Sequence, residues 1–306
     1  MSQPRKIYPG QTVQLTRRTL RRTFLLRPDA QLNQIVSYLV AFFAKKFGME
    51  IGAIQVLSDH YHIVLTDVLG QLPDFTRELN RILALCIKGL RKWEGPVWEP
   101  DAVGMVELLT AEAEAEAMVY TWLNAVRAGL VADPRHWPGV TTLLDDVDGL
   151  RMTFTRPDVY LDASSGRWPE TVELGVTMPP KLAALGQEEA RRLLRAELER
   201  QLAEAQRQMR EQGRKPVGPE RCQGVSPYQR ATTWEPLRSL NPVLAAGRGL
   251  RRALREGIRA LRAFRLAYRE ALRRWQQGDR NVLFPYGTWW MVRHHGAAVG
   301  PPVPLV

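Results

Sequence analysis

Between residues 13 and 130 the apolar residues change their spacing several times, and the order of these segments most constrains the fold. Segments typical of strands, with β-branched or alternating apolar residues, lie at 13–26, 50–59, 60–67 and 97–108. Segments typical of helices, with apolar residues three or four apart, lie at 30–47, 73–93 and 110–130. This order predicts an α+β domain, with a ferredoxin-like antiparallel sheet covered by helices.

Residues with strong local preferences mark the ends of several segments. Asp29 is suited to cap the first helix, and Gly48 is suited to end it in the left-handed conformation. Pro73 is suited to the first turn of the second helix, which Gly95 and Pro96 would end. Ser58 and Asp59 supply a tight turn, so the second and third strands are expected to be neighbours.

The pattern changes near residue 145, where we expect the first domain, residues 1–145, to end. Turn-forming residues between 150 and 180 predict a β-hairpin. A narrow apolar stripe at 187–212 predicts a charged helix that packs through one face. We therefore divide the rest of the chain into two regions. Residues 146–246 hold the hairpin, the charged helix and a linker at 213–241. Residues 247–306 hold an arginine-rich helix, which the helical pattern at 242–277 predicts, and an aromatic tail. A mainly helical appendage is therefore expected after the first domain.

The chain of 306 residues has a net charge of +11, which favours a polyanionic partner, nucleic acid before membrane. Its longest nearly uncharged apolar stretch, residues 35–44, is too short to span a bilayer, so no membrane association is expected. The first residues, MSQPRKIYPG, lack the apolar run of a secretory signal. Cys86 and Cys222 form no C-x-x-C pair and are expected to be buried free thiols. These features predict a cytoplasmic protein.

The sharpest local motif is Ser58-Asp59-His60-Tyr61-His62. On a strand His60 and His62 point to one face and Tyr61 to the other, so two imidazoles can converge on one metal ion. The alternative is a pair of surface or hydrogen-bonded histidines on an edge strand, the commoner situation for an isolated H-x-H. A second pair, at 294 and 295, is adjacent in sequence, so its rings point apart and make poor joint ligands.

A second motif lies within residues 117–131. If 110–130 is one helix, Tyr120 and Asn124 are four residues apart and lie side by side on one face. That arrangement would place an amide oxygen, which can bind a metal, beside a phenol, which can act as a nucleophile. The alternative for Tyr120 is a half-buried core aromatic.

Together the two motifs resemble a known family. His60-Tyr61-His62 is similar to the His-hydrophobe-His motif of the HUH single-strand endonucleases. Tyr120, followed by Leu123-Asn124-Ala125-Val126-Arg127-Ala128-Gly129-Leu130, resembles the Tyr-x-x-x-Asn-Pro-x-Arg-Ala-Gly-Leu signature of REP-associated tyrosine transposases. Gly95-Pro96-Val97-Trp98 and Pro134-Arg135-His136-Trp137-Pro138 resemble the intervening and closing segments of that family. The resemblance covers residues 10–140 and implies the HUH endonuclease fold.

The resemblance implies a bacterial, nucleoid-associated transposase that cleaves and rejoins single-stranded or hairpin DNA. His60, His62 and Asn124 would then bind a divalent ion, Mg²⁺ or Mn²⁺, and Tyr120 would be the nucleophile that forms a 5′-phosphotyrosine. Such a link conserves the phosphodiester energy, so rejoining needs no ATP, and the chain has no G-x-x-x-x-G-K-[ST] phosphate loop. A homodimer is compatible with this family resemblance.

The chain departs from the family pattern at three places. Asp59 stands where the family usually has Asn, and is expected either to tighten metal binding or to repel the DNA phosphate. Ala125 stands where the family has Pro, but it is not one of the proposed ligands. After the closing Trp-Pro the chain has Gly139-Val140-Thr141-Thr142 instead of an aromatic residue and serines.

Basic residues gather in two regions. The first 30 residues hold seven Lys or Arg and one Asp, and residues 248–277 hold ten Arg and two Glu. The second region is expected either to bind DNA phosphates or to be a solvated charged face. A third alternative is that it binds an anionic membrane or a protein. The aromatic residues at 282–296 favour packing in a core over stacking on bases. The arginines expected to contact DNA are Arg17, Arg18, Arg21, Arg22, Arg127, Arg251, Arg252 and Arg255.

Two other functions are compatible with the same motifs. One is a catalytically silent regulator that binds nucleic acid on the same fold, and the other is an HUH nickase that does not complete transposition. A metal-dependent covalent link between the tyrosine and DNA would separate the enzyme from the silent regulator. Repeats that flank the gene would separate the transposase from the nickase.

Overall fold

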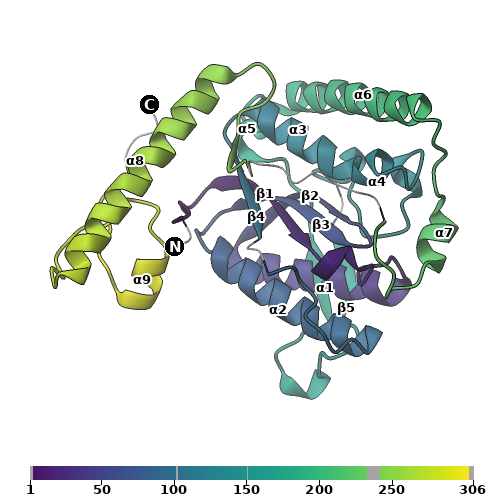
Figure 1. Cartoon of the computed structure of the whole chain (residues 1–306), viewed down its shortest axis with the longest axis horizontal. Coiled ribbons are helices and arrows are strands. Elements are labelled where there is room, and N and C mark those ends of the chain that lie inside the picture. The colour runs from purple at the N-terminus through teal and green to yellow at the C-terminus, as the bar shows by residue number, and fades with distance from the viewer. Residues whose placement is uncertain (1–2, 101–102, 150, 233–241, 303–306) are drawn as a thin grey trace.

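A five-stranded sheet with strand order β2-β3-β1-β4-β7 lies at the centre of the computed structural model (Figure 1). The structure describes residues 3–100, 103–149, 151–232 and 242–302. The first four strands pair antiparallel, and the last pairs in parallel with β4. The strands are β1 (Gln11–Arg18), β2 (Met49–Val56), β3 (His60–Asp67), β4 (Gly104–Leu108) and β7 (Leu244–Ala245).

The elements β1, α1 (Ala30–Phe47), β2, β3, α2 (Leu72–Arg91) and β4 follow one another in ferredoxin-like order. The predicted α+β class, with an antiparallel sheet covered by helices, is confirmed. The ends of α1 are also those that the sequence predicts. Asp29 Oδ1 accepts a hydrogen bond from the Leu32 N–H at 3.0 Å, and Gly48 ends the helix with a φ of 66°.

Different helices cover the two faces of the sheet (Figure 1). The helices α1 and α2 cover one face, where side chains such as Leu15 and Ile63 join a large apolar cluster. On the other face lie α3 (Ala111–Trp122) and α4 (Asn124–Arg127), and α6 (Gln187–Glu211) packs over them. The predicted charged helix is therefore present, and it buries one narrow stripe that includes Ala190 and Leu194.

The prediction of one continuous helix over residues 110–130 is wrong. The helix stops at Trp122, and Leu123 has φ −93° and ψ 4° before α4 begins. The side chain of Gln55 bonds to backbone groups on both sides of this break, and a tertiary contact of this kind is not visible in local sequence spacing. Tyr120 and Asn124 consequently lie on two different helices.

Two predicted strand segments are shorter than expected. Of residues 13–26, only 13–18 lie in a strand, β1, which begins earlier, at Gln11, and a 3₁₀ turn, η1 (Leu20–Arg22), follows it. Arg21 and Arg22 adopt φ values of 52° and 53°, a left-handed conformation that interrupts extended structure. Of the described residues between 97 and 108, which exclude 101 and 102, only Gly104–Leu108 is paired as a strand.

The predicted hairpin consists of β5 (Met152–Thr155) and β6 (Thr171–Leu174), which pair antiparallel. It packs against α1, and Trp168 between its strands lies with its ring centroid 4.9 Å from that of Phe42. The hydroxyl of Tyr38 also donates to the Pro169 carbonyl at 2.6 Å. The hairpin thus shares the core of the α1 and α2 face.

The C-terminal region is mainly helical, as predicted, but its long helix α8 (Arg251–Gln276) begins nine residues later than Pro242, where the pattern placed it. Phe284, from the tail, is fully buried against the rings of Tyr268 and Trp275, at centroid distances of 5.5 and 6.1 Å. The remaining short elements are η2 (Pro134–His136), η3 (Leu144–Asp146), η4 (Ala163–Ser165), α5 (Pro180–Ala183), α7 (Pro219–Gly224) and α9 (Trp290–His295). Part of the predicted linker, 233–241, lies outside the described residues.

Both cysteines are buried free thiols, as predicted. Burial raises the pKa of Cys86 to about 12, which disfavours its reactive thiolate form. None of the helices in the described part of the chain combines the length and apolar character that a bilayer span requires.

Candidate functional site

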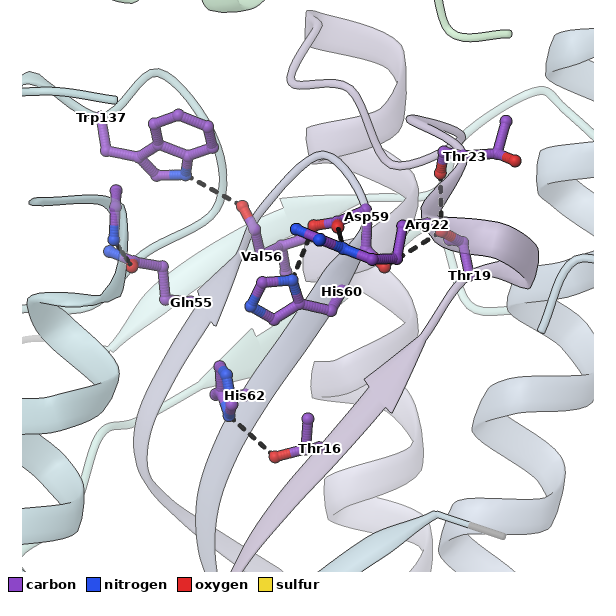
Figure 2. Close-up of polar contacts among 11 residues, drawn as sticks. Thr16, Thr19, Arg22, Thr23, Gln55, Val56, Asp59, His60, His62 and Trp137 are labelled. Atoms are coloured by element: carbon purple, nitrogen blue, oxygen red, sulfur yellow. Dashed lines mark hydrogen bonds and ion pairs between the residues drawn. The ribbon is translucent and has the colours of Figure 1, made fainter. Parts of the chain in front are cut away.

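The alternating side chains of β3 give the two faces of the sheet different chemistry. Tyr61 and Ile63 belong to the apolar cluster beneath α1 and α2. His60 and His62 point to the opposite face, where Val64 joins the cluster beneath α3. The two imidazole rings lie 5.0 Å apart between centroids, with their planes at 88° (Figure 2). The predicted convergence of the two histidines on one face is therefore present.

His60 is held by the residue before it. Its Nδ1 lies 2.7 Å from Asp59 Oδ1, while the other oxygen of Asp59 accepts a hydrogen bond from Arg22 Nε at 2.9 Å (Figure 2). Burial raises the pKa of Asp59, but the hydrogen bonds and positive charges of His60 and Arg22 outweigh burial and hold that pKa below its ordinary value. An ionised Asp59 therefore orients the His60 ring through Nδ1.

His62 is held from the neighbouring strand. Thr16 is its register partner on β1, and Thr16 Oγ1 lies 2.8 Å from His62 Nδ1. Burial, followed by the positive charges of His60 and Arg18, lowers the pKa of His62 well below 6.5, so its ring is neutral at pH 7. Both histidines thus use Nδ1 in protein contacts, and neither Nε2 has a hydrogen-bond partner among the described residues.

The turn that brings Arg22 to Asp59 is itself tied down. Thr19 Oγ1 donates to the carbonyls of Thr23, at 2.6 Å, and of Asp59, at 3.0 Å (Figure 2). Arg21 and Arg22 both have positive φ, a conformation that costs free energy in residues with a Cβ and that commonly clusters at functional sites. Sequence reasoning missed these threonines, because their role depends on pairing between distant segments.

Tyr120 reaches this face from the end of α3. Its ring centroid lies 5.5 Å from that of His62, with the ring planes at 88°. The guanidinium carbon of Arg127, an exposed residue, lies 5.0 Å from the centroid of the Tyr120 ring. Tyr120 is half-buried, so the three residues form one group that is open to solvent on the arginine side.

Gln55 connects the tyrosine helix to the histidine strand. It is the register partner of His62 on β2 and is fully buried. Its amide nitrogen donates to the Trp122 carbonyl at 2.9 Å and to Thr141 Oγ1 at 3.0 Å, and its oxygen accepts the Ala125 N–H at 2.8 Å. Sequence reasoning missed Gln55, although its place three residues before Ser58, where the turn region begins, could have pointed to it.

Asn124, the third expected ligand, lies next to the backbone group that Gln55 holds. The residue is buried, and its side chain makes no hydrogen bond to any residue that the structure describes. Its position in the first turn of α4 differs from the expected position one turn beyond Tyr120 on a single helix.

The segment after the closing Trp-Pro covers the edge strand β2. Trp137 Nε1 donates to the Val56 carbonyl at 2.9 Å (Figure 2), and the Val56 N–H donates to the Val140 carbonyl at 2.9 Å. A Cβ on Gly139 would lie 2.5 Å from Trp137 Nε1 and 2.9 Å from the Val56 carbonyl oxygen, so only glycine fits without rearrangement. The departure from the family pattern at 139–142 therefore has a structural role.

The other arginines that were expected to contact DNA lie in three places. Arg18 is the register partner of His60 and shares its face, whereas Arg17 pairs with Tyr61 and lies 5.7 Å from the Trp98 ring on the opposite face. The backbone N–H of Arg21 donates to Glu99 Oε1 at 2.6 Å. The remaining three, Arg251, Arg252 and Arg255, lie on α8, at the edge of the molecule (Figure 1).

The donor set fits a divalent ion with open coordination positions. Among the described residues, no three or more His, Cys, Asp or Glu side chains come together to hold a metal. The donors here would be Nε2 of His60, Nε2 of His62 and the amide oxygen of Asn124. Hydrogen bonds to the second ring nitrogen, as Asp59 and Thr16 make, are the usual support of metal-binding histidines.

No protein-family model and no curated protein matches the sequence. Among solved structures, the chain is similar to a REP-associated tyrosine transposase bound to a REP hairpin, with 21% identity over 48% of this chain and 85% of that one, at a TM-score of 0.40. It is also similar to a proposed transposase from Deinococcus radiodurans R1, with 25% identity over 34% of this chain and 84% of that one, at a TM-score of 0.27. Both are described as transposases, the class of protein that the sequence motifs resemble.

Proposed function

We propose that the protein is a metal-dependent transposase of single-stranded DNA, in which Tyr120 is the nucleophile. The observation that carries this proposal is the contact between Tyr120 and His62, at 5.5 Å between rings, on the face where both histidines keep Nε2 available. Two imidazoles that are held through Nδ1 beside a half-buried phenol suit phosphoryl transfer. The basic net charge of +11 supports a DNA substrate.

The ion would be held by His60, His62 and Asn124, and when bound it supplies positive charge near the scissile phosphate. The chain itself contributes orientation. Asp59 and Thr16 fix the two imidazole rings through Nδ1. Arg127, whose guanidinium carbon lies 5.0 Å from the Tyr120 ring centroid, can contact phosphate oxygens beside the phenol.

Cleavage is a transesterification. The Tyr120 hydroxyl oxygen forms a bond to phosphorus and releases its proton to solvent, while the bond from phosphorus to the 3′ oxygen breaks. The 3′ oxygen takes up a proton and leaves as a free hydroxyl, and the phosphate stays on the tyrosine as a 5′-phosphotyrosine. Attack by another 3′-OH reverses these bond changes and joins the new strand without ATP.

Gln55 is proposed as a positioning residue for this reaction. Its three hydrogen bonds fix the break between α3 and α4, and so fix Tyr120 and Asn124 relative to His62. Where the family pattern has a proline without an N–H, this chain has Ala125, whose N–H needs an acceptor when buried. Gln55 provides that acceptor.

The test uses the full chain with a labelled single-stranded hairpin taken from the flanks of its own gene. We expect cleavage with Mn²⁺, none with EDTA, and none with Tyr120→Phe, while DNA affinity is unchanged in that variant. DNA binding without cleavage, on each flanking hairpin and with each divalent ion, would instead identify a silent binding protein. Cleavage without joining to a target strand would identify a nickase.

A further inference from the structure

The two long helices of the C-terminal half have different charge. The 25 residues of α6 include six Arg and six Glu, and its ion pairs join residues three apart, such as Arg200 with Glu197 and Arg207 with Glu204. The 26 residues of α8 include nine Arg, two Glu and no Lys. The charges of α6 therefore balance, and three of its six arginines are paired with acids, whereas α8 has seven more positive than negative charges.

Three arginines of α8 are paired with acids. Arg252 pairs with Glu256 at 2.8 Å, Arg273 with Glu270 at 2.7 Å, and Arg274 with Asp279 at 2.5 Å. The other six form no ion pair among the described residues, and at about 100° per residue they fall within about 120° of the helix circumference. They are Arg251, Arg255, Arg259, Arg262, Arg265 and Arg269, which we call the arginine row. The row is about 27 Å long at the usual helical rise.

The apolar side of α8 is already covered. Its C-terminal half packs on the tail, where Phe264 and Ala271 are buried and Tyr268 and Trp275 contact Phe284. Its N-terminal half lies against the edge of the sheet, where a Cβ on Gly257 would lie 2.5 Å from Leu109 Cδ1. An amphipathic helix binds a membrane through its apolar side, so this arrangement disfavours a lipid partner for α8.

The exposed side carries the arginine row and no aromatic ring. All members of the row except Arg265, which is half-buried, are exposed, and α8 runs along the outer edge of the molecule (Figure 1). Guanidinium groups bind phosphates with two hydrogen bonds each, and a row made only of arginine suits this contact. Single-stranded DNA is usually held by stacking on aromatic residues, but those of α8 are on its packed side.

We propose that α8 binds the phosphate backbone of double-stranded DNA through the arginine row, whose length corresponds to about eight base pairs. The inference rests on the proposed function for the identity of the nucleic acid, and it adds a duplex-binding surface separate from the histidine and tyrosine site. A hairpin substrate contains both kinds of DNA, a stem for α8 and a single strand for Tyr120.

The experiment compares two triple variants that remove the same number of positive charges. Arg255→Gln/Arg259→Gln/Arg262→Gln changes unpaired members of the row, and Arg192→Gln/Arg273→Gln/Arg274→Gln changes one arginine of α6 and two of α8 that are paired with acids. Binding to a duplex of about 20 base pairs, and to a single strand of the same length, is measured by fluorescence anisotropy in EDTA between about 50 and 200 mM salt. EDTA keeps the measurement independent of cleavage.

The first triple variant should lose about 10-fold to 100-fold in duplex affinity, and the slope of log affinity against log salt should become shallower by about 2 to 3. The second should change the slope by less than 1, and both should keep single-strand affinity and metal-dependent cleavage of a short single strand. Equal losses in the two triples, or an unchanged slope in the first, would overturn the proposal. Binding of wild-type protein to phosphatidylserine vesicles, lost in the first triple while duplex affinity is retained, would assign the row to a membrane.

Discussion

The two faces of the central sheet differ in the polarity and exposure of the side chains that lie on them, although alternating residues of the same strands form both faces. On the face beneath α1 and α2, Tyr61 is buried and donates to Asn80 Oδ1 at 2.9 Å, and burial raises the pKa of its phenol above the ordinary value. On the other face, Tyr120 is half-buried and contacts His62. One tyrosine completes a core, while the other lies where a substrate can reach it.

The difference shows what the polar face requires in order to fold. Three of its buried polar side chains, Gln55, Asp59 and His62, have hydrogen-bond partners within the protein. Buried polar groups are costly without such partners, so these networks stabilise the fold while they orient the site. The face beneath α1 and α2 depends more on close packing, although its buried Tyr61 hydroxyl is also paired, with Asn80.

The largest expected effect separates the two tyrosines. Tyr120→Phe should reduce strand cleavage by about 10⁴-fold or more, because only the attacking oxygen is removed. Tyr61→Phe, the matched control, should leave cleavage within about 2-fold and lower the free energy of unfolding by about 1 kcal/mol through its lost hydrogen bond. Gel assays of cleavage and urea denaturation measure the two quantities. A normal cleavage rate in Tyr120→Phe would remove that residue from the chemistry.

The next largest expected effect is on Mn²⁺ affinity, and it distinguishes neighbouring residues on one face of β3. His60→Ala and His62→Ala should each weaken Mn²⁺ binding by about 100-fold or more, because each removes a ligand. Val64→Ala, on the same strand and face, should lower stability by about 1 to 2 kcal/mol and leave Mn²⁺ affinity unchanged. Isothermal titration calorimetry measures the affinities. If all three variants bound Mn²⁺ as the wild type does, the histidines would not be ligands.

Gln55→Met tests whether the polar face needs its connection to α3 and α4. Methionine keeps the volume but leaves the Ala125 N–H and the Trp122 carbonyl without partners, which should cost about 2 to 4 kcal/mol of unfolding free energy. If Gln55 positions Tyr120, the cleavage rate at saturating DNA should fall by about 10-fold to 100-fold with KM nearly unchanged. Gln55→Glu, which keeps the acceptor for Ala125, should recover part of the rate. If Gln55→Met lost stability but its folded fraction cleaved DNA at the normal rate, the role of Gln55 would be structural only.

Asp59→Asn tests whether the Asp59 carboxylate supports His60 as a metal ligand. The substitution introduces the residue that the family pattern has at this position. Loss of the carboxylate should weaken Mn²⁺ affinity by about 10-fold, since the partner of a ligand's second ring nitrogen tunes that ligand. Asp59→Asn also removes the ion pair between Arg22 and Asp59, so Arg22→Gln serves as the control for the effect of losing that ion pair. Tighter Mn²⁺ binding in Asp59→Asn would contradict this account.

The smallest expected effect is on the pH dependence of stability. The folded protein keeps His62 neutral well below pH 6.5, while the unfolded chain binds a proton near pH 6.5, so acid favours unfolding. Metal-free protein should therefore lose up to about 1.4 kcal/mol per pH unit below pH 6.5 through this group. His62→Gln should reduce that slope in urea denaturation experiments at pH 7 and pH 5.5. An equal slope in the variant would mean that His62 is solvated.

Sequence reasoning worked where local interactions decide the structure. The Asp29 cap, the Gly48 end of α1 and the shared face of His60 and His62 all follow from helix and strand periodicity. It was wrong where a distant side chain decides, as at the α3 break, which Gln55 stabilises from β2. The contacts of Thr16 with His62 and of Arg22 with Asp59 depend on strand register and on a left-handed turn, which one sequence does not reveal.

The central claim is that Tyr120, beside the two histidines, forms a covalent bond to DNA. The most direct measurement is mass spectrometric mapping of the protein–DNA adduct formed on a single-stranded hairpin from the gene's flanks, with Mn²⁺ and with EDTA. We expect a nucleotide-modified peptide that contains Tyr120. The modified peptide should form with Mn²⁺ but not with EDTA, and it should be absent from Tyr120→Phe. An adduct on another residue, or one that forms equally in EDTA, would contradict it.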